Sequence, residues 1–352
     1  SSRRQLQSAV GKGFPRSVLQ EENAPFLGSC HGSVKTVDVV VMAKLSEHAA
    51  EKVRRAVSQS GGAPHFFARL EDAVEAGLRP QVVFGNPSVD AIERCETLEW
   101  VHTVSAGIDQ YAKEPDRIPG RVTITNSSGV YGATGGEHIL AMMLYFNRGL
   151  HHFRSVQLRG VWDRDLSHAR SLKGETLCVV GLGDLGRNVV QRARAFEMRI
   201  FGVKRNPEPV EGVERVVSPD EMDEILPEVQ HLAITLPLTR ETRGMFDARR
   251  LNLLPRGAYL YNIGRGPIVD EQALIEALQS GRLKGAGLDV FHEEPLPKDH
   301  PFWRMDNVLI TPHLGANTPW DHDRAADLFV ENFLRFRRGE PLNNKVDVAL
   351  GY

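Results

Sequence analysis

Three glycines with the spacing G-x-G-x-x-G are the first residues that could do chemistry. Gly181, Gly183 and Gly186 follow a β-branched run at 176–180 and precede a helical pattern at 187–196. In such a turn the first glycine permits the tight bend, the second lets a pyrophosphate approach the backbone, and the third lets helix and strand pack closely. The helix N-terminus adds unpaired N–H groups for the phosphates. The pattern predicts a dinucleotide-binding turn, and a purely structural glycine turn is the less favoured interpretation.

Two cations stand where such sites usually carry an acidic residue. About 20 positions after the glycines, an Asp or Glu normally accepts hydrogen bonds from the adenosine ribose, but this chain has Lys204 and Arg205. Arg can pair bidentately with a 2′-phosphate and Lys can pair with it as a point charge. The pair therefore favours NADP(H) over NAD(H). In the alternative interpretation, Lys204 points into solvent while Arg205 stacks on adenine.

Three further residues form a candidate catalytic group. Arg265, Glu294 and His313 each come just after one of the last three strands expected in the chain. The planar guanidinium suits a carboxylate and an adjacent keto oxygen, and a histidine exchanges protons near neutral pH. A glutamate could hold one imidazole nitrogen and stabilise the imidazolium. Each residue alone has an ordinary structural explanation, but three complementary groups at adjacent strand ends favour catalysis.

The elements that must position these residues form two series of strands separated by helical patterns, which is typical of parallel α/β sheets. The first series has expected strands at 37–42, 81–84, 100–104 and 122–125, with a helix at 47–57. The second series has six expected strands, at 176–180, 199–203, 231–236, 258–262, 284–289 and 308–311. Six strands separated by helices predict a doubly wound Rossmann sheet.

Three helices complete this expectation. One long helix at about 135–157 is expected to bridge two domains, and the helix after the fourth strand of the second series should begin after Asp270 and end near Gly281. A helix at 323–338 should return to the first domain with Ala325, Leu328, Phe329, Phe333 and Phe336 facing inward.

Composition excludes several classes of protein. The net charge is 43 − 45 = −2, which argues against a nucleic-acid binder that needs an excess of cations. The three separated cysteines, Cys30, Cys95 and Cys178, exclude a disulfide scaffold, and we expect no metal. No apolar stretch reaches the roughly 18 residues of a membrane span. We therefore expect a cytoplasmic protein, while the Arg- and Ser-rich residues 1–20 fit either organellar import or an ordinary leader.

Several strings closely resemble the signatures of the D-2-hydroxyacid dehydrogenases, including the glyoxylate/hydroxypyruvate reductase-like members. They are Ser105-Ala106-Gly107-Ile108-Asp109, Glu137-His138, Leu236-Pro237-Leu238-Thr239 with Thr242-Arg243, 262–278, Gly287-Leu288-Asp289-Val290-Phe291, Glu294-Pro295-Leu296-Pro297, Thr311-Pro312-His313-Leu314-Gly315 and 339–347. The similarity covers residues 80–347 and is weak before Val37.

The resemblance implies a Rossmann domain inserted into a smaller flavodoxin-like α/β domain, and usually a homodimer. It divides the chain into an N-terminal extension (1–36), a substrate domain (37–134 and 319–352) and a dinucleotide-binding domain (135–318). It implies that Arg265 orients the substrate, that His313 is the acid/base and that Glu294 is its partner. Backbone amides of Ser105, Ala106 and Gly107 should hold the substrate carboxylate. Implied cofactor contacts, besides those above, are Asp184, Leu185, Leu236, Pro237, Thr242, Ile263, Gly264, Asp289 and Gly315.

The function expected from these residues is reduction of a small 2-oxo acid to the D-2-hydroxy acid, with glyoxylate and hydroxypyruvate as the first substrates to consider. A different class remains as the alternative, namely a nicotinamide-sensing protein that resembles the family's corepressors. An oxidoreductase acting on phosphite is a third interpretation, which the Glu294-Pro295-Leu296-Pro297 loop disfavours. Relatives that act on formate resemble this chain but carry Gln in place of Glu294, which counts against formate.

Overall fold

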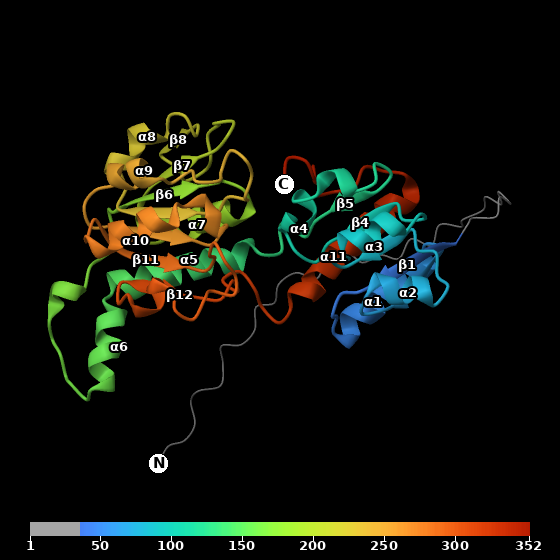
Figure 1. The fold of residues 1–352 in the computed structure, drawn as a ribbon, viewed down its shortest axis with the longest axis horizontal. Helices are drawn as coiled ribbons and strands as arrows, with labels where there is room; N and C mark the ends of the chain where they lie inside the picture. Colours follow the sequence, from blue (N-terminus) through green and yellow to red (C-terminus); the bar gives the residue numbers. More distant parts are fainter. Residues whose placement is uncertain (1–35) are drawn as a thin grey trace, which may run out of the picture. The chain divides into compact units, whose positions relative to one another are not determined.

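The computed structural model describes residues 36–352 (Figure 1). The expected extension therefore lies outside the described residues, except for Thr36, and so does Cys30. Cys95 and Cys178 are buried free thiols. Among the helices formed by residues 36–352, none combines the length and apolar character that a membrane span requires.

The first sheet has five parallel strands in the order β2-β1-β3-β4-β5. The strands are β1 (Val37–Val41), β2 (Gly62–Phe66), β3 (Val82–Phe84), β4 (Trp100–His102) and β5 (Thr123–Thr125). This order is that of flavodoxin-like folds, as expected. The strand β2 was not expected from the sequence, because its segment Gly-Ala-Pro-His-Phe contains two residues that weaken strands. It lies at the sheet edge, where a proline is tolerated.

Helices connect these strands and a distant helix covers them. The connecting helices are α1 (Glu47–Gln59), α2 (Leu70–Glu75), α3 (Val89–Arg94) and α4 (Asp109–Ala112). The late helix α11 (Asp321–Arg338) packs on the same sheet, where Phe329 stacks on Phe84 at 4.5 Å and on Trp100 at 5.4 Å between ring centroids. The expected return of the chain to the first sheet is confirmed, and Gly339 ends the helix with φ +67°.

The second sheet has seven parallel strands, one more than expected, in the order β12-β11-β10-β9-β6-β7-β8. They are β6 (Thr176–Val180), β7 (Arg199–Val203), β8 (Arg215–Val217), β9 (His231–Ile234), β10 (Ala258–Asn262), β11 (Leu283–Leu288) and β12 (Val308–Ile310). The prediction of six strands was wrong because β8 has only three residues at the edge, too few for a periodic signal. The last three strands do lie side by side, as the catalytic argument required.

The helix expected at 135–157 is two helices, α5 (Gly132–Asn147) and α6 (Leu150–Leu158). The chain breaks at Gly149, which has φ +65° and lies against His168: a Cβ there would come within 2.7 Å of the His168 carbonyl oxygen. A left-handed residue cannot continue a right-handed helix. The prediction of one continuous helix was therefore wrong.

The remaining helices cover the second sheet. They are α7 (Asp184–Arg194), α8 (Met222–Ile225), α9 (Ala248–Leu253) and α10 (Glu271–Gln279). The 3₁₀ segments are Pro115–Arg117, which precedes β5 of the first sheet, and Leu166–His168, Leu226–Glu228, Gly266–Ile268 and Pro301–Arg304 later in the chain. The start of α10 is as predicted, because the Asp270 carboxylate accepts a hydrogen bond from the Ala273 N–H at 3.0 Å. Gly281, just past its end, has φ +66°.

Candidate active site

The glycine turn between β6 and α7 has the geometry that its spacing predicts. Gly181 has φ +102°, a conformation open mainly to glycine. A Cβ on Gly186 would lie 1.8 Å from the Gly181 carbonyl oxygen, so only glycine lets the helix approach the strand this closely. Gly183, the residue before α7, would have nothing within 4 Å of an added Cβ, and its backbone faces open space.

These environments predict opposite effects for two matched substitutions. Gly186→Ala should lower the free energy of unfolding by about 1 to 3 kcal/mol, because the methyl group overlaps backbone atoms. Gly183→Ala should unfold like the wild type yet weaken NADPH binding, because the methyl group occupies space that a pyrophosphate needs. Urea unfolding and fluorescence titration with NADPH measure the two effects. Equal stability losses in both variants would contradict the prediction.

A cavity of about 880 Å³ opens beside this turn. Seven of the expected cofactor residues line it: Gly181, Gly183, Lys204, Arg205, Leu236, Pro237 and Thr242. The candidate catalytic residues do not belong to its lining. The cavity is also lined by Glu241 and Tyr352, which contact Arg205 and which no sequence motif indicated.

Other expected cofactor residues lie around the turn or deeper in the sheet. The Asp184 and Leu185 side chains face α5, where Cβ atoms on Gly132 and Gly135 would lie 2.4 Å from Asp184 Oδ1 and 2.2 Å from Leu185 Cδ2. Ile263 is buried at the end of β10. Its neighbour Gly264 lies against Leu236, since an added Cβ would be 2.6 Å from the Leu236 carbonyl oxygen.

Each cation at the end of β7 has an acidic neighbour. Lys204 pairs with Glu208, four residues further on. Arg205 donates from Nη2 to Glu241 Oε2 at 2.8 Å, contacts the Tyr352 hydroxyl and lies 4.9 Å from the centre of the Tyr352 ring. Both cations line the cavity, and each of them is paired with a carboxylate.

His313 and Glu294 form a hydrogen-bonded pair. The distance from His313 Nδ1 to Glu294 Oε2 is 2.6 Å, and Glu294 Oε1 accepts the Phe291 N–H at 2.9 Å. Both side chains are partly exposed, at 43% and 36%. Within residues 36–352 no group hydrogen-bonds His313 Nε2, so this nitrogen can exchange a proton with a ligand.

The loop that carries His313 is organised by Asp289. This buried carboxylate accepts hydrogen bonds from the Thr311 hydroxyl at 2.5 Å and from the N–H groups of Leu314 and Gly315 at 3.0 and 2.9 Å. His138 Nε2 lies 3.0 Å from the Thr311 hydroxyl, and burial lowers the pKa of His138 although the charge of Asp289 acts to raise it. His138 and Thr311 both belong to the family-like motifs, but the sequence predicted no role for them.

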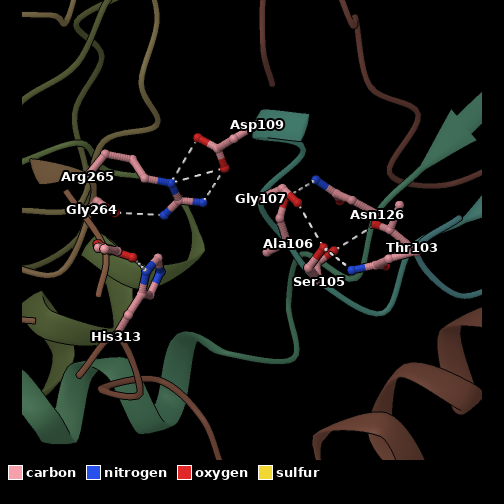
Figure 2. Close-up of polar contacts among 11 residues, drawn as sticks. Thr103, Ser105, Ala106, Gly107, Asp109, Asn126, Gly264, Arg265 and His313 are labelled. Atoms are coloured by element: carbon pink, nitrogen blue, oxygen red, sulfur yellow. Dashed lines mark hydrogen bonds and ion pairs between the residues drawn. The ribbon is translucent and has the colours of Figure 1, made fainter. Parts of the chain in front are cut away.

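Arg265 is held by an acidic residue that the sequence argument did not select. Its Nε lies 2.9 and 3.1 Å from Asp109 Oδ1 and Oδ2, and its Nη2 lies 2.7 Å from Oδ2 (Figure 2). Burial acts to raise the pKa of Asp109, but the hydrogen bonds and charge of Arg265, a backbone hydrogen bond and the charge of His313 together bring it below its ordinary value. The guanidinium of Arg265 therefore favours the ionised form of this carboxylate.

The segment 105–107 has its carbonyl groups engaged and its N–H groups available. Ser105 donates to the Gly107 carbonyl at 2.8 Å, Asn126 to the Ala106 carbonyl at 2.7 Å and Thr103 to the Ser105 carbonyl at 2.8 Å (Figure 2). Between residues 36 and 352, no group accepts a hydrogen bond from the N–H of 105, 106 or 107. Three backbone donors in sequence suit a carboxylate.

Comparison with known proteins assigns the family. Residues 140–315, half of the chain, match the sequence model described as D-isomer specific 2-hydroxyacid dehydrogenase, NAD binding domain. The chain belongs to this family. It is therefore an oxidoreductase of the D-2-hydroxyacid dehydrogenase class, with a dinucleotide-binding Rossmann sheet and a second α/β sheet, as expected from its sequence.

Individual family members are similar over most of this chain. D-3-phosphoglycerate dehydrogenase of Methanocaldococcus jannaschii is 34% identical over 74% of the chain, which spans only 49% of that relative. The solved structure of a D-isomer specific 2-hydroxyacid dehydrogenase from Xanthobacter autotrophicus Py2, in complex with NADPH and MES, is 31% identical with a TM-score of 0.77, covering 90% of this chain and 100% of that one.

A third relative carries a more specific name. It is an NADPH-dependent glyoxylate/hydroxypyruvate reductase from Sinorhizobium meliloti, solved with NADP and sulfate, which is 28% identical with a TM-score of 0.77 over 90% of this chain and 100% of that one. These 2-hydroxyacid dehydrogenases do not support the alternative of a corepressor-like sensor.

Proposed function

We propose that this family member reduces a small 2-oxo acid of the glyoxylate or hydroxypyruvate type to the D-2-hydroxy acid with NADPH. The observation that carries the proposal is the His313–Glu294 pair, whose residues follow β12 and β11, beside the strand β10 that precedes Arg265. The names of the relatives solved with NADPH or NADP, one of them a glyoxylate/hydroxypyruvate reductase, support the same substrate and cofactor.

The residues around the cavity fit the proposed cofactor. The glycine turn offers a helix N-terminus to the pyrophosphate, and Lys204 and Arg205 offer two positive charges to a 2′-phosphate. When bound, the nicotinamide supplies the hydride for the carbonyl carbon. Leu236, Ile263 and Gly264 lie together between the glycine turn and Arg265, and they would border the nicotinamide.

The protein's own residues then bind the acid and move one proton. The N–H groups of Ser105, Ala106 and Gly107 and the guanidinium of Arg265 hold the carboxylate, and Arg265 also stabilises the negative charge that develops on the keto oxygen. His313, protonated and held by Glu294, gives the proton from Nε2 to that oxygen. Hydride on carbon and proton on oxygen together complete the alcohol.

Initial rates of NADPH and NADH oxidation test this function. The panel contains glyoxylate, hydroxypyruvate, pyruvate and a bulky phenyl analogue. Fast turnover of a small acid with NADPH supports the proposal. Preference for NADH overturns the choice of cofactor, whereas failure of every acid in a protein that binds NADPH overturns the substrate class.

Replacing both cations should change the preference for the cofactor. In Lys204→Ser/Arg205→Ser, the KM for NADPH should rise about 10- to 100-fold, since hydrogen bonds to charged groups contribute about 1.5–3 kcal/mol. The KM for NADH should stay nearly constant, because NADH has no 2′-phosphate. Arg199→Ser, at the opposite end of the same strand, is the control. Equal changes in both KM values would contradict a phosphate-reading role.

We also propose the division into a substrate domain (37–134 and 319–352) and a dinucleotide-binding domain (135–318), and assembly as a homodimer. The buried cores of the two sheets support the division, since each is built from its own residues. Leu158, Trp162 and Leu166 are largely exposed around α6, and such apolar side chains suit a contact between two copies. Sedimentation of the full chain measures its mass.

A further inference from the structure

We propose that Asp109 is the positioning residue that aligns the guanidinium of Arg265 toward the substrate. The inference rests on the proposed function, because it concerns how the same site binds a 2-oxo acid. Asp109 ends the segment Ser105-Ala106-Gly107-Ile108-Asp109, and its partner Arg265 lies 156 residues away in the chain.

The guanidinium of Arg265 has more hydrogen-bond donors than its partners Asp109 and Gly264 use. An arginine has five N–H groups in a planar fork. Asp109 takes the Nε–H and one N–H of Nη2, while the Gly264 carbonyl oxygen accepts one N–H of Nη1 at 2.6 Å. Two N–H groups remain, one on Nη1 and one on Nη2, at the tip of the fork. Asp109 thus leaves to a ligand the two parallel donors that a carboxylate or keto oxygen can share.

Asp109 also has a specific place in the chain. It is the first residue of α4 and lies two residues after the segment 105–107, whose N–H groups are available. The same short segment therefore carries the proposed carboxylate donors and the side chain that holds Arg265. Asp109 therefore fixes the distance between these backbone donors and the Arg265 guanidinium.

The guanidinium of Arg265 approaches the backbone closely at Gly107. A Cβ on this residue would lie 2.0 Å from Arg265 Nη2 and 2.9 Å from Asp109 Oδ2. Only glycine allows the guanidinium to lie against the backbone here. Gly107 and Asp109 together place the fork of Arg265 beside the backbone donors.

Asp109 and Arg265 form a partly exposed ion pair, with side chains 38% and 25% exposed. Arg265 counters the effect of burial and lowers the pKa of Asp109, which favours the charged carboxylate. The bidentate ion pair resists rotation of the guanidinium because Asp109 accepts hydrogen bonds from both Nε and Nη2. Without the carboxylate, the long arginine side chain would sample several rotamers, and its alignment would have to be recovered on each binding event.

Asp109→Asn tests the proposal. The amide keeps the size of the side chain but loses the charge and one of the two acceptors. We expect kcat/KM for the 2-oxo acid to fall about 10²-fold, the effect of a small misplacement of a catalytic group, while the Kd for NADPH stays unchanged. Asp109→Glu, which restores the charge, should recover part of the loss. Glu214→Gln is the control, because Glu214 holds Arg199 outside the site through the same two nitrogens, Nε at 3.2 Å and Nη2 at 2.8 Å.

A double-mutant cycle separates positioning from a general structural role. If Asp109 acts through Arg265, Asp109→Asn should cost little in a protein that already carries Arg265→Gln. If the two substitutions act independently, the fold-loss of kcat/KM in the double variant equals the product of the two single losses, and this result would overturn the proposal. An unchanged kcat/KM in Asp109→Asn would overturn it as well. Urea unfolding of each variant shows whether a loss of folding accounts for the result.

Binding of oxalate distinguishes failure of this inference from failure of the proposed function. Oxalate is a dicarboxylate that needs no turnover, and its affinity for the NADPH-loaded protein can be measured by calorimetry. If wild type reduces no acid in the panel, the proposed function fails, yet weaker oxalate binding in Asp109→Asn than in Glu214→Gln still supports positioning. Equal oxalate affinities in the two variants, or no binding by wild type, overturn it.

Discussion

His313→Asn is expected to lower kcat about 10²- to 10⁴-fold, the usual contribution of a positioned acid/base group, while NADPH binds as it does to wild type. Asparagine suits this position because His313 has φ +55°, a conformation that asparagine tolerates better than most residues. The variant therefore keeps the backbone of the loop but has no group at 313 that can be protonated near neutral pH. Initial rates with the best acid of the panel and fluorescence titration with NADPH measure the two effects.

His65→Asn is the matched control for this loss. His65 also contacts a carboxylate, with its Nε2 2.9 Å from Asp38 Oδ1, but it lies on the edge strand β2 away from the site. Its turnover should equal that of wild type. If His313→Asn also retains wild-type turnover, His313 is not the acid/base.

Acid should destabilise the fold through His102, the last residue of β4. Its ring is buried and its Nδ1 lies 2.7 Å from the Thr125 hydroxyl, which also accepts the Trp100 indole N–H at 2.9 Å. Burial lowers the pKa of His102 from 6.5 to about 3. Between these two values His102 is protonated in the unfolded chain but neutral in the folded chain. Stability from this residue is therefore complete above pH 6.5 and declines as the pH falls toward 3.

The expected slope is as much as about 1.4 kcal/mol per pH unit within that window. Urea unfolding at pH 7, 6, 5 and 4 measures it, and His102→Gln provides the comparison, because glutamine does not titrate. The variant should be less stable at pH 7 but should lose less stability between pH 6 and 4. Other groups, such as Glu175 with its lowered pKa, act equally in both proteins. Parallel pH profiles for the two proteins would contradict the assignment.

Most of the fold could be predicted because its strands are buried on both faces. Strands β6, β7 and β10 have the expected bounds, since runs such as Thr-Leu-Cys-Val-Val are continuous apolar signals. The two missed strands, β2 and β8, are edge strands with Gly, Pro or Arg in them, and they are defined by pairing with a neighbour and not by their own pattern. The break at Gly149 was missed for another reason, since a glycine within a helical pattern is only a weak signal for the end of a helix.

The sequence also predicted only part of the candidate site. The glycine turn and the residues after three adjacent strands could be selected because local spacing and strand order bring them to one edge of the sheet. Asp109 and His138 could not, because their partners Arg265 and Thr311 are 156 and 173 residues away. Such contacts depend on how the two parts of the chain pack, which no periodicity within either part records.

The position of α11 has a consequence for how the chain is synthesised. The aromatic rings of Phe84 and Trp100 in the first sheet are covered by Phe329, which follows β5 by about 200 residues. At a translation rate of about 5–20 residues per second, the ribosome needs roughly 10 to 40 s to reach it. During that time α1 is the only helix of the described chain that covers this apolar face of the first sheet, while the strands of the second sheet are already made. The first sheet is therefore completed after the second, and until then it exposes apolar surface that a chaperone would bind.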